Sequence, residues 1–349
     1  MTNLFLLTFG CACFIYLGWG SRRLPEEHWQ FMATLPRQRL GEEPWQGINL
    51  TWYGFFSANA YLVAVALFLL LTGSLALPRA SMALFTMILL SVCIPASTLV
   101  ARIVEKKAHT LTVGGAVFVG LISAPWILAL FNLAAQHGGG SSLPIFPVLS
   151  ALAIAYAFGE GLGRLACISF GCCYGKPVEE NPAWLKHLFG KWSVCYSGAT
   201  KKIAYASDLE GKPVLPVQTV TAAIYVITGL AGCALFMSGY FAAAFAFTIT
   251  ITQLWRVVSE FLRADYRGEG KLSVYQWMGL LAIPYTWLLP LCFPQAPGLH
   301  ADLLLGLVSL WTAELFLGLQ GLWLFILFFT GRSAVTGATL TFHVKHERI

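Results

Sequence analysis

The sequence predicts an all-α polytopic membrane protein with about 7–9 transmembrane helices and a small α/β extramembrane head. Of its 349 residues, 57% are hydrophobic and only 11% are charged, whereas a soluble domain carries roughly 25% charged residues. The mean hydropathy is +0.70, and the charged residues gather in a few segments between long apolar runs. Most of these runs approach or exceed the roughly 20 residues that a helix needs to cross a bilayer.

The apolar runs divide the chain into three predicted regions. Residues 1–50 comprise an extra N-terminal membrane helix and a polar connection, residues 51–292 form a membrane core, and residues 293–349 add a C-terminal helix and a polar tail with some β character. The individual candidate spans cover residues 3–19, 50–72, 82–100, 112–135, 144–170, 217–238, 241–262, 273–292 and 303–330.

The small head is expected over residues 174–215, which hold most of the charge in the middle of the chain. Within it, Val194–Ser197 and Lys202–Ala206 resemble short strands, and Gly211–Pro213 resembles a turn. The segment is too short to fold as an independent domain, so we expect it to rest on the membrane helices.

The cysteines predict neither a disulfide framework nor a metal site. Five of the nine lie in apolar runs, where cysteine behaves as a small hydrophobic residue. Cys172 and Cys173 are adjacent, so they lack the C-x-x-C spacing of a structural zinc site. No cofactor and no nucleic-acid motif is predicted, and the net charge of +6 favours the anionic headgroups of a lipid bilayer as a partner.

A first polar cluster interrupts the apolar run that ends near residue 170. Glu160 and Arg164 are four residues apart, so on a helix they share a face and can pair. An arginine at the centre of a membrane helix costs roughly 2.5 to 3.5 kcal/mol. A charge in this position therefore needs a partner or a function, and the glycines around it allow close backbone approach.

A second polar cluster ends the run near residue 262. Gln253, Arg256, Glu260 and Arg263 follow one another at spacings of three, four and three, which places them on one face of a helix. Such a face must lie against a cavity, another helix or the interface. One interpretation is an arginine–glutamate pair that locks two helices together. The other is a binding site.

The presence of two such clusters favours an anionic-lipid site. Arg164 and Arg256 lie within apolar runs, and each has a glutamate four residues away. Guanidinium groups bind phosphate through paired hydrogen bonds and keep their charge at any working pH. One arginine could stabilise a departing phosphate while an acid accepts a proton. The pair Gly114–Gly115, which opens another run, predicts tight helix packing.

Four stretches carry a resemblance to a known family. Leu162–Pro177 resembles the signature of the prolipoprotein diacylglyceryl transferases, in a branch that reads Gly-Cys-Cys-Tyr-Gly. Trp52–Gly54 resembles the W-Y-G of that family and Leu215–Gln218 resembles its H-P-S-Q. Trp255–Asp265, followed by Leu272–Gln276, resembles its F-R-x-x-x-E-F-x-R-x-x-D and S-x-x-Q segments. The order of the stretches also agrees.

The resemblance implies an enzyme of the bacterial plasma membrane. Such an enzyme transfers the diacylglyceryl group of phosphatidylglycerol to the lipobox cysteine of a prolipoprotein signal peptide, forming a thioether and releasing glycerol phosphate. It implies Arg164 and Arg256 as the phosphate-binding arginines, with Glu260 as a third catalytic residue. The substrate-binding residues that we expect beside them are Tyr53, Glu160, Gln218 and Arg263.

Several polar positions of the family are replaced in this chain. The residues that stand there are Val119 for a histidine, Cys167 for an asparagine, Cys172 for a glutamate, Leu215 for a histidine, Thr221 for a glutamate and Thr252 for a tyrosine. These losses leave open a related lipid transferase with another acceptor, or a non-catalytic protein that binds anionic phospholipid. If thiol activation is retained, Glu160 is one candidate for a replacement base.

Overall fold

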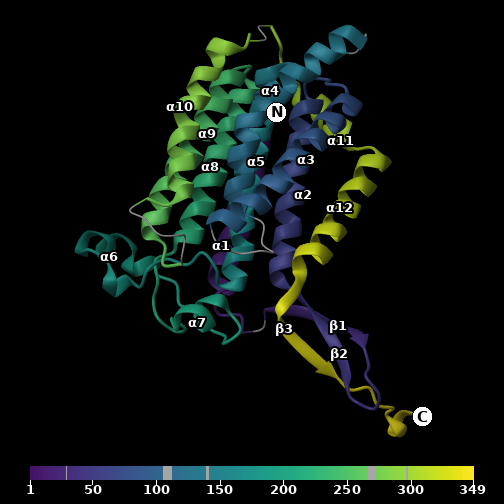
Figure 1. The fold of residues 1–349 in the computed structure, drawn as a ribbon, viewed down its shortest axis with the longest axis vertical. Coiled ribbons are helices and arrows are strands. Elements are labelled where there is room, and N and C mark those ends of the chain that lie inside the picture. Colours follow the sequence, from purple (N-terminus) through teal and green to yellow (C-terminus); the bar gives the residue numbers. More distant parts are fainter. Residues whose placement is uncertain (29, 105–111, 139–140, 266–271, 296–297) are drawn as a thin grey trace.

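The computed structural model describes residues 1–28, 30–104, 112–138, 141–265, 272–295 and 298–349. A bundle of long helices carries a small head and a three-stranded sheet at the same end (Figure 1). The fold class predicted from the sequence is confirmed, and the protein is a multi-pass membrane protein. Eight helices of the described part are long and apolar enough to span a membrane: α1 (Thr2–Arg23), α2 (Trp52–Gly73), α3 (Arg79–Val104), α4 (Val113–Gly138), α5 (Ile145–Phe170), α8 (Val217–Met237), α9 (Phe241–Leu262) and α12 (Ala313–Gly331).

Helix α5 is the centre of the bundle. It packs against α2, α8 and α9, and 72% of its most apolar window is buried, against 17% for α3 at the periphery. Small residues allow the close packing: a Cβ on Gly161 would lie 3.0 Å from Tyr225 of α8, and one on Gly159 would lie 3.0 Å from Ala64 of α2. A polar residue on α5 is therefore surrounded by protein.

Helix α10 (Val274–Cys292) packs along α9 and α4. Its first turn is a capping box in which Ser273 N donates to Gln276 Oε1 (2.8 Å) and Gln276 N donates to Ser273 Oγ (3.2 Å). Gln276 Nε2 also donates to the carbonyl of Val257 in α9 at 3.0 Å. The S-x-x-Q stretch thus fixes the start of α10 against the polar end of α9.

The C-terminal apolar run is not the single helix that the sequence predicted. It forms α11 (Leu303–Leu310) and α12, because Trp311 leaves the helical backbone with ψ 52°. Asp302 caps α11 through Leu304 N at 2.9 Å, while Asp302 N donates to Ser74 O at the end of α2. These bonds hold α11 against α2, and eight residues are too few to span a bilayer.

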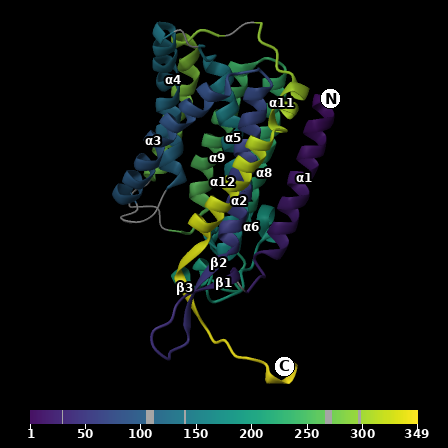
Figure 2. The ribbon, with the colours of Figure 1, turned by 90° about the vertical axis from the view of Figure 1, so that its right-hand side faces the viewer.

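A three-stranded antiparallel sheet pairs strands from the N-terminal and C-terminal parts of the chain (Figure 2). Its order is β1 (Phe31–Gln38), β2 (Trp45–Thr51) and β3 (Arg332–Leu340). The β character predicted for the C-terminal tail is confirmed, whereas the segment between α1 and α2, predicted as a polar connection, contains β1 and β2. The central strand β2 pairs with β3 from the far end of the chain, and this pairing leaves no local sequence signal.

The head contains α6 (Ala183–Phe189), α7 (Lys202–Ser207) and the 3₁₀ turns Val178–Glu180 and Gly190–Trp192. The strand predicted over residues 202–206 is wrong, because this segment forms α7, which buries Ile203 in the core. The strand predicted over 194–197 reduces to an isolated bridge between Val194 and Val214.

A buried lysine fastens the head to the membrane bundle. Lys201 is 0% exposed, and its Nζ donates to the carbonyl of Leu24, just beyond α1, at 2.5 Å. It lies 5.7 Å from the centre of the Tyr196 ring. Burial disfavours the charged amine and lowers the pKa of Lys201 from 10.5 to about 8, against an opposing effect of Glu27.

We expect the contribution of Lys201 to stability to grow as the pH rises. Between about pH 8 and pH 10.5 the unfolded lysine holds a proton that the folded one has lost, so folding is favoured by rising pH in that range. The unfolding temperature of the wild type in detergent should therefore rise relative to that of Lys201→Met between pH 8 and pH 10.5. A difference that stays constant over this range would contradict the account.

Candidate functional site

The segment after α5 turns sharply at its glycines. Gly171 ends the helix in the left-handed conformation, with φ 67°. Cys173 also has a positive φ, 59°, which costs a non-glycine residue roughly 1 kcal/mol or more. Gly175 lies so close to the backbone of Leu215 that any Cβ there would collide. The Gly-Cys-Cys-Tyr-Gly stretch is therefore a tight turn pressed against the start of α8.

Backbone hydrogen bonds join this turn to the end of α9. Lys176 N donates to Leu262 O at 2.9 Å, and Ala264 N donates to Tyr174 O at 3.1 Å. Gln218 at the start of α8 adds a third tie, because its Nε2 donates to Cys172 O at 2.9 Å. The ends of α5, α8 and α9 are thus brought to one place, and with them the two polar clusters.

Arg164 and Glu160 form an ion pair one helical turn apart on α5. The arginine side chain is 14% exposed and the glutamate 9%, so the pairing offsets much of the cost of placing either charge here. Within the described part of the chain, the buried Nε of Arg164 has no hydrogen-bond partner. A buried donor without an acceptor is costly, and it indicates a place for a ligand.

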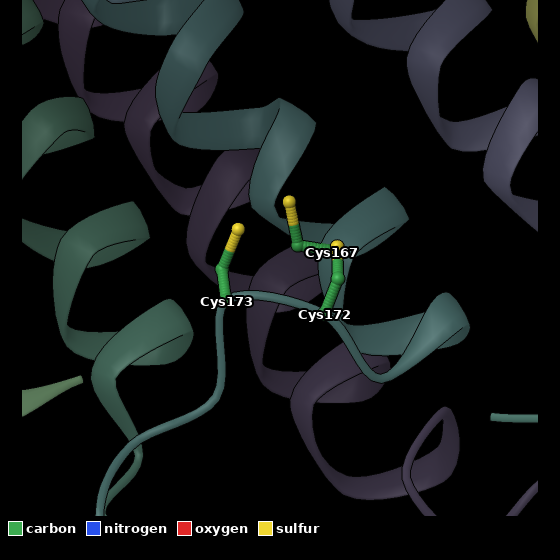
Figure 3. A group of neighbouring side chains, drawn as sticks. All are labelled: Cys167, Cys172 and Cys173. Carbon is green, nitrogen blue, oxygen red and sulfur yellow. The ribbon is translucent and has the colours of Figure 1, made fainter. Parts of the chain in front are cut away.

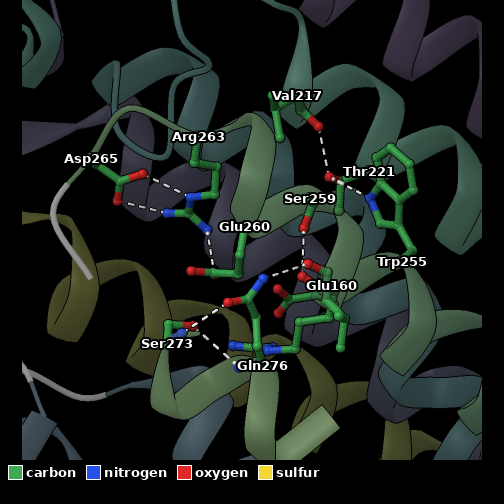
Figure 4. A network of polar contacts seen from close by, with 12 residues as sticks. Glu160, Val217, Thr221, Trp255, Ser259, Glu260, Arg263, Asp265, Ser273 and Gln276 are labelled. Atoms are coloured by element: carbon green, nitrogen blue, oxygen red, sulfur yellow. Dashed lines mark hydrogen bonds and ion pairs between the residues drawn. The ribbon is translucent and has the colours of Figure 1, made fainter. Parts of the chain in front are cut away.

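The charges of the second cluster pair differently from the simplest expectation. Glu260 pairs with Arg263, three residues further along the chain, and their charged atoms lie 3.6 Å apart. It does not pair with Arg256, four residues before it. Arg263 also donates two parallel hydrogen bonds of 2.7 Å to Asp265, just beyond α9 (Figure 4). Two carboxylates therefore hold Arg263 in place.

Arg256 remains without a carboxylate partner among the described residues. Its guanidinium lies 5.6 Å from the centre of the Tyr275 ring at the start of α10, an arrangement that stabilises a cation without neutralising it. Gly114 of α4 makes room for it, since a Cβ there would collide with Arg256 Nη2 and the Tyr275 ring. The tight packing predicted at Gly114 is present, and the side chain that packs there is Arg256.

A small cavity of about 20 Å³ opens where these elements meet. Three guanidinium groups and one carboxylate contribute to its lining, so it favours an anion. Five of the predicted site residues come together there. The full lining is Arg164, Cys173, Val217, Gln218, Thr221, Tyr225, Arg256, Ser259, Glu260 and Arg263.

Two predicted residues lie beside the cavity and not in its lining. Glu160 is held by Arg164. Tyr53 of α2 is partly buried and packs edge-on against Phe170, with ring centres 5.8 Å apart.

Five residues of the lining were not predicted as site residues from the sequence: Cys173, Val217, Thr221, Tyr225 and Ser259. Tyr225 belongs to a buried polar chain, since its hydroxyl donates to Thr252 O at 3.0 Å and lies 3.3 Å from that of Tyr156. The sequence signal that could have identified Tyr225 is the presence of tyrosines in the middle of apolar runs. Thr221, one of the replaced family positions, accepts from Trp255 Nε1 at 2.9 Å and supports the wall (Figure 4).

Three cysteines gather at the end of α5 (Figure 3). The sulfur atoms of Cys167, Cys172 and Cys173 all lie within 4.8 Å of one another, and all three are thiols. The spacing of the adjacent pair Cys172 and Cys173 does not predict this cluster. The turn at Gly171 folds the chain back so that Cys172 N donates to Cys167 O at 3.0 Å, which brings the third thiol in.

The fold and the site define a multi-pass membrane protein with a cationic cavity at one end of its helix bundle. The family model of the prolipoprotein diacylglyceryl transferases matches residues 44–291. The chain belongs to this family, which is a family of transferases, and the resemblance seen in the sequence is confirmed. Comparison with curated proteins gives no significant match. The matched region contains the whole cavity and leaves α1, β1, α11, α12 and β3 outside it.

We expect Gly114→Ala to lower the unfolding temperature, because the new methyl group must displace Arg256 or Tyr275. Overpacking of this kind costs roughly 1–3 kcal/mol. Gly318→Ala in α12 is the matched control, since a Cβ there meets nothing within 4 Å and alanine is the better helix former. Equal unfolding temperatures for the two variants would contradict the placement of Arg256 over Gly114.

Proposed function

We propose that the protein transfers the diacylglyceryl group of phosphatidylglycerol to the thiol of a prolipoprotein lipobox cysteine in the bacterial inner membrane. Glycerol phosphate leaves and a thioether forms. Family membership supports the reaction class. The observation that carries the proposal is the cavity lined by both Arg164 and Arg256.

The two arginines are suited to a phosphodiester. Arg164 has a buried Nε without an acceptor, and Arg256 has no carboxylate partner among the described residues. A phosphate between them would accept from both guanidinium groups, which bind phosphate oxygens with paired donors. The acyl chains would run from the cavity along apolar residues of α5, α8 and α9.

The chemical step is displacement at the glycerol carbon that bears the phosphate. A thiolate electron pair forms the sulfur–carbon bond, and the electrons of the carbon–oxygen bond pass to the departing phosphate. Its extra negative charge develops between Arg164 and Arg256, where fixed positive groups in a medium of low dielectric stabilise it most. Glu260 and Asp265 hold and neutralise Arg263 at the rim of the cavity, so the positive charge for the departing phosphate comes from Arg164 and Arg256.

A second candidate function is the binding of anionic phospholipid without catalytic turnover. The replacement of polar family residues favours this non-catalytic function. The residues that stand at those positions are Val119, Cys167 and Cys172. The phosphate-binding arginines would serve either function, so only turnover separates the two.

Turnover is measured with the full-length protein in vesicles that contain phosphatidylglycerol labelled in its headgroup glycerol. A peptide with a lipobox cysteine serves as the acceptor. We expect labelled glycerol phosphate to be released together with a lipidated peptide. Arg164→Ala and Arg256→Ala should each lower the rate about 10²–10³-fold, as for loss of one transition-state donor.

Arg102→Ala is the matched control, because Arg102 is an exposed arginine at the end of α3 and outside the cavity lining. It should leave the rate unchanged. Binding of phosphatidylglycerol without release of glycerol phosphate would establish the non-catalytic reading. Release without lipidation of the peptide would assign the activity to another acceptor.

A further inference from the structure

The three-cysteine cluster has the composition of a zinc site that keeps one position open. Zinc bound to sulfur has bonds of about 2.3 Å, so tetrahedral ligands place sulfurs roughly 3.8 Å apart. The sulfurs of Cys167, Cys172 and Cys173 already lie within 4.8 Å of one another, a spacing that small side-chain rotations close. Structural zinc sites have four protein ligands, whereas catalytic ones have three and leave the fourth for water or substrate.

The backbone conformation holds the three cysteines together. Neighbouring residues in an extended chain point to opposite sides, but the left-handed φ of 59° at Cys173 departs from that geometry and lets both thiols of the pair approach Cys167 (Figure 3). Gln218 fixes the carbonyl of Cys172 at 2.9 Å. A non-glycine residue held in this conformation is typical of functional sites.

The surroundings complement an anionic metal centre. Zinc with three thiolates carries one net negative charge, and a fourth thiolate makes it two. Arg164 and Arg263 line the same cavity as Cys173, so two guanidinium groups lie on the side of the cluster that faces the cavity. The cluster therefore borders the cavity in which the phosphate is proposed to lie. Cys167 and Cys172 also occupy two positions where the family carries an asparagine and a glutamate.

We propose that Cys167, Cys172 and Cys173 bind a zinc ion whose fourth position takes the acceptor thiol and delivers it as a thiolate. The inference rests on the proposed transfer of a diacylglyceryl group and names how its nucleophile is generated. A thiol that coordinates zinc is deprotonated outright. A soft, sulfur-only ligand set is one that zinc accepts.

The step balances without an oxidant or reductant. The acceptor thiol binds zinc and loses its proton to water, which leaves a zinc-bound thiolate. One sulfur electron pair then attacks the glycerol carbon, the carbon–oxygen bond breaks, and the oxygen keeps that electron pair as glycerol phosphate departs between the arginines. The product is a neutral thioether, a much weaker zinc ligand than a thiolate, so it leaves the metal. Zinc stays divalent throughout.

The first test uses Co²⁺ as a spectroscopic substitute for zinc in the purified full-length protein. We expect one Co²⁺ per chain, with thiolate-to-cobalt charge-transfer absorption and the visible bands of a tetrahedral ion. Cys172→Ser and Cys167→Ser should each lower the metal affinity by at least tenfold. Cys195→Ser, at an exposed cysteine of the head, should leave it unchanged. Unfolding temperatures check that each variant is folded.

The second test adds lipobox peptides to the cobalt-loaded protein. A cysteine peptide should raise the charge-transfer absorption by about one third, because a fourth thiolate joins three at the open position, whereas a serine peptide should not. No thiolate-to-cobalt absorption in the wild type, or absorption that survives in both Cys172→Ser and Cys167→Ser, would overturn the proposal.

Transfer assays then separate this inference from the proposed function. Chelation should stop lipidation of the peptide and added zinc should restore it. Transfer that continues unchanged after chelation and in Cys172→Ser would overturn the zinc site and leave the transferase standing. A metal centre that responds to the cysteine peptide without any release of glycerol phosphate would support the thiol site and overturn phosphatidylglycerol transfer.

Discussion

The burial of Arg164 beside the central axis of an apolar bundle is the constraint on which the site depends. Removing a guanidinium from water is costly, and Glu160 on the next turn offsets part of that cost. The pair still leaves one buried donor of Arg164 without an acceptor in the described part of the chain. The fold can keep this donor because α5 is the best-covered helix and the turn after it is tied to α8 and α9.

The same tie explains why two clusters from distant parts of the chain act as one site. Hydrogen bonds from the Gly-Cys-Cys-Tyr-Gly turn to the end of α9 bring Arg256 and Arg263 to the side of Arg164. Arg263 is neutralised by Glu260 and Asp265, whereas Arg256 rests on an aromatic ring. The cavity therefore holds one fixed arginine and two that can turn toward a phosphate.

The helices could be predicted because their length is set by the bilayer and their composition by the lack of water. The gathering of Arg164, Arg256, Glu260, Arg263 and Gln218 was also predictable, since the resemblance to the family placed each residue on its helix. The pairing within α9 was not. Spacings of three and four both bring side chains to one face, so spacing alone does not predict that Glu260 pairs with Arg263, which also pairs with Asp265 beyond the helix end.

Other features depended on contacts that a linear pattern does not contain. The sheet pairs β2 with a strand nearly the whole chain away, at Trp45 and Leu340. The cysteine cluster depends on the left-handed turn at Gly171 and on the positive φ of Cys173, so spacing alone could not predict three thiols together. The break at Trp311 separates α11 from α12 inside a run that is uniformly apolar.

The central claim is that a lipid phosphate lies between Arg164 and Arg256. An experimental structure of the protein with bound phosphatidylglycerol tests it most directly. We expect the phosphate within hydrogen-bond distance of Arg164 Nε and the Arg256 guanidinium, with the acyl chains along apolar residues of α5, α8 and α9. A phosphate bound elsewhere, with both arginines turned toward protein carboxylates, would contradict it.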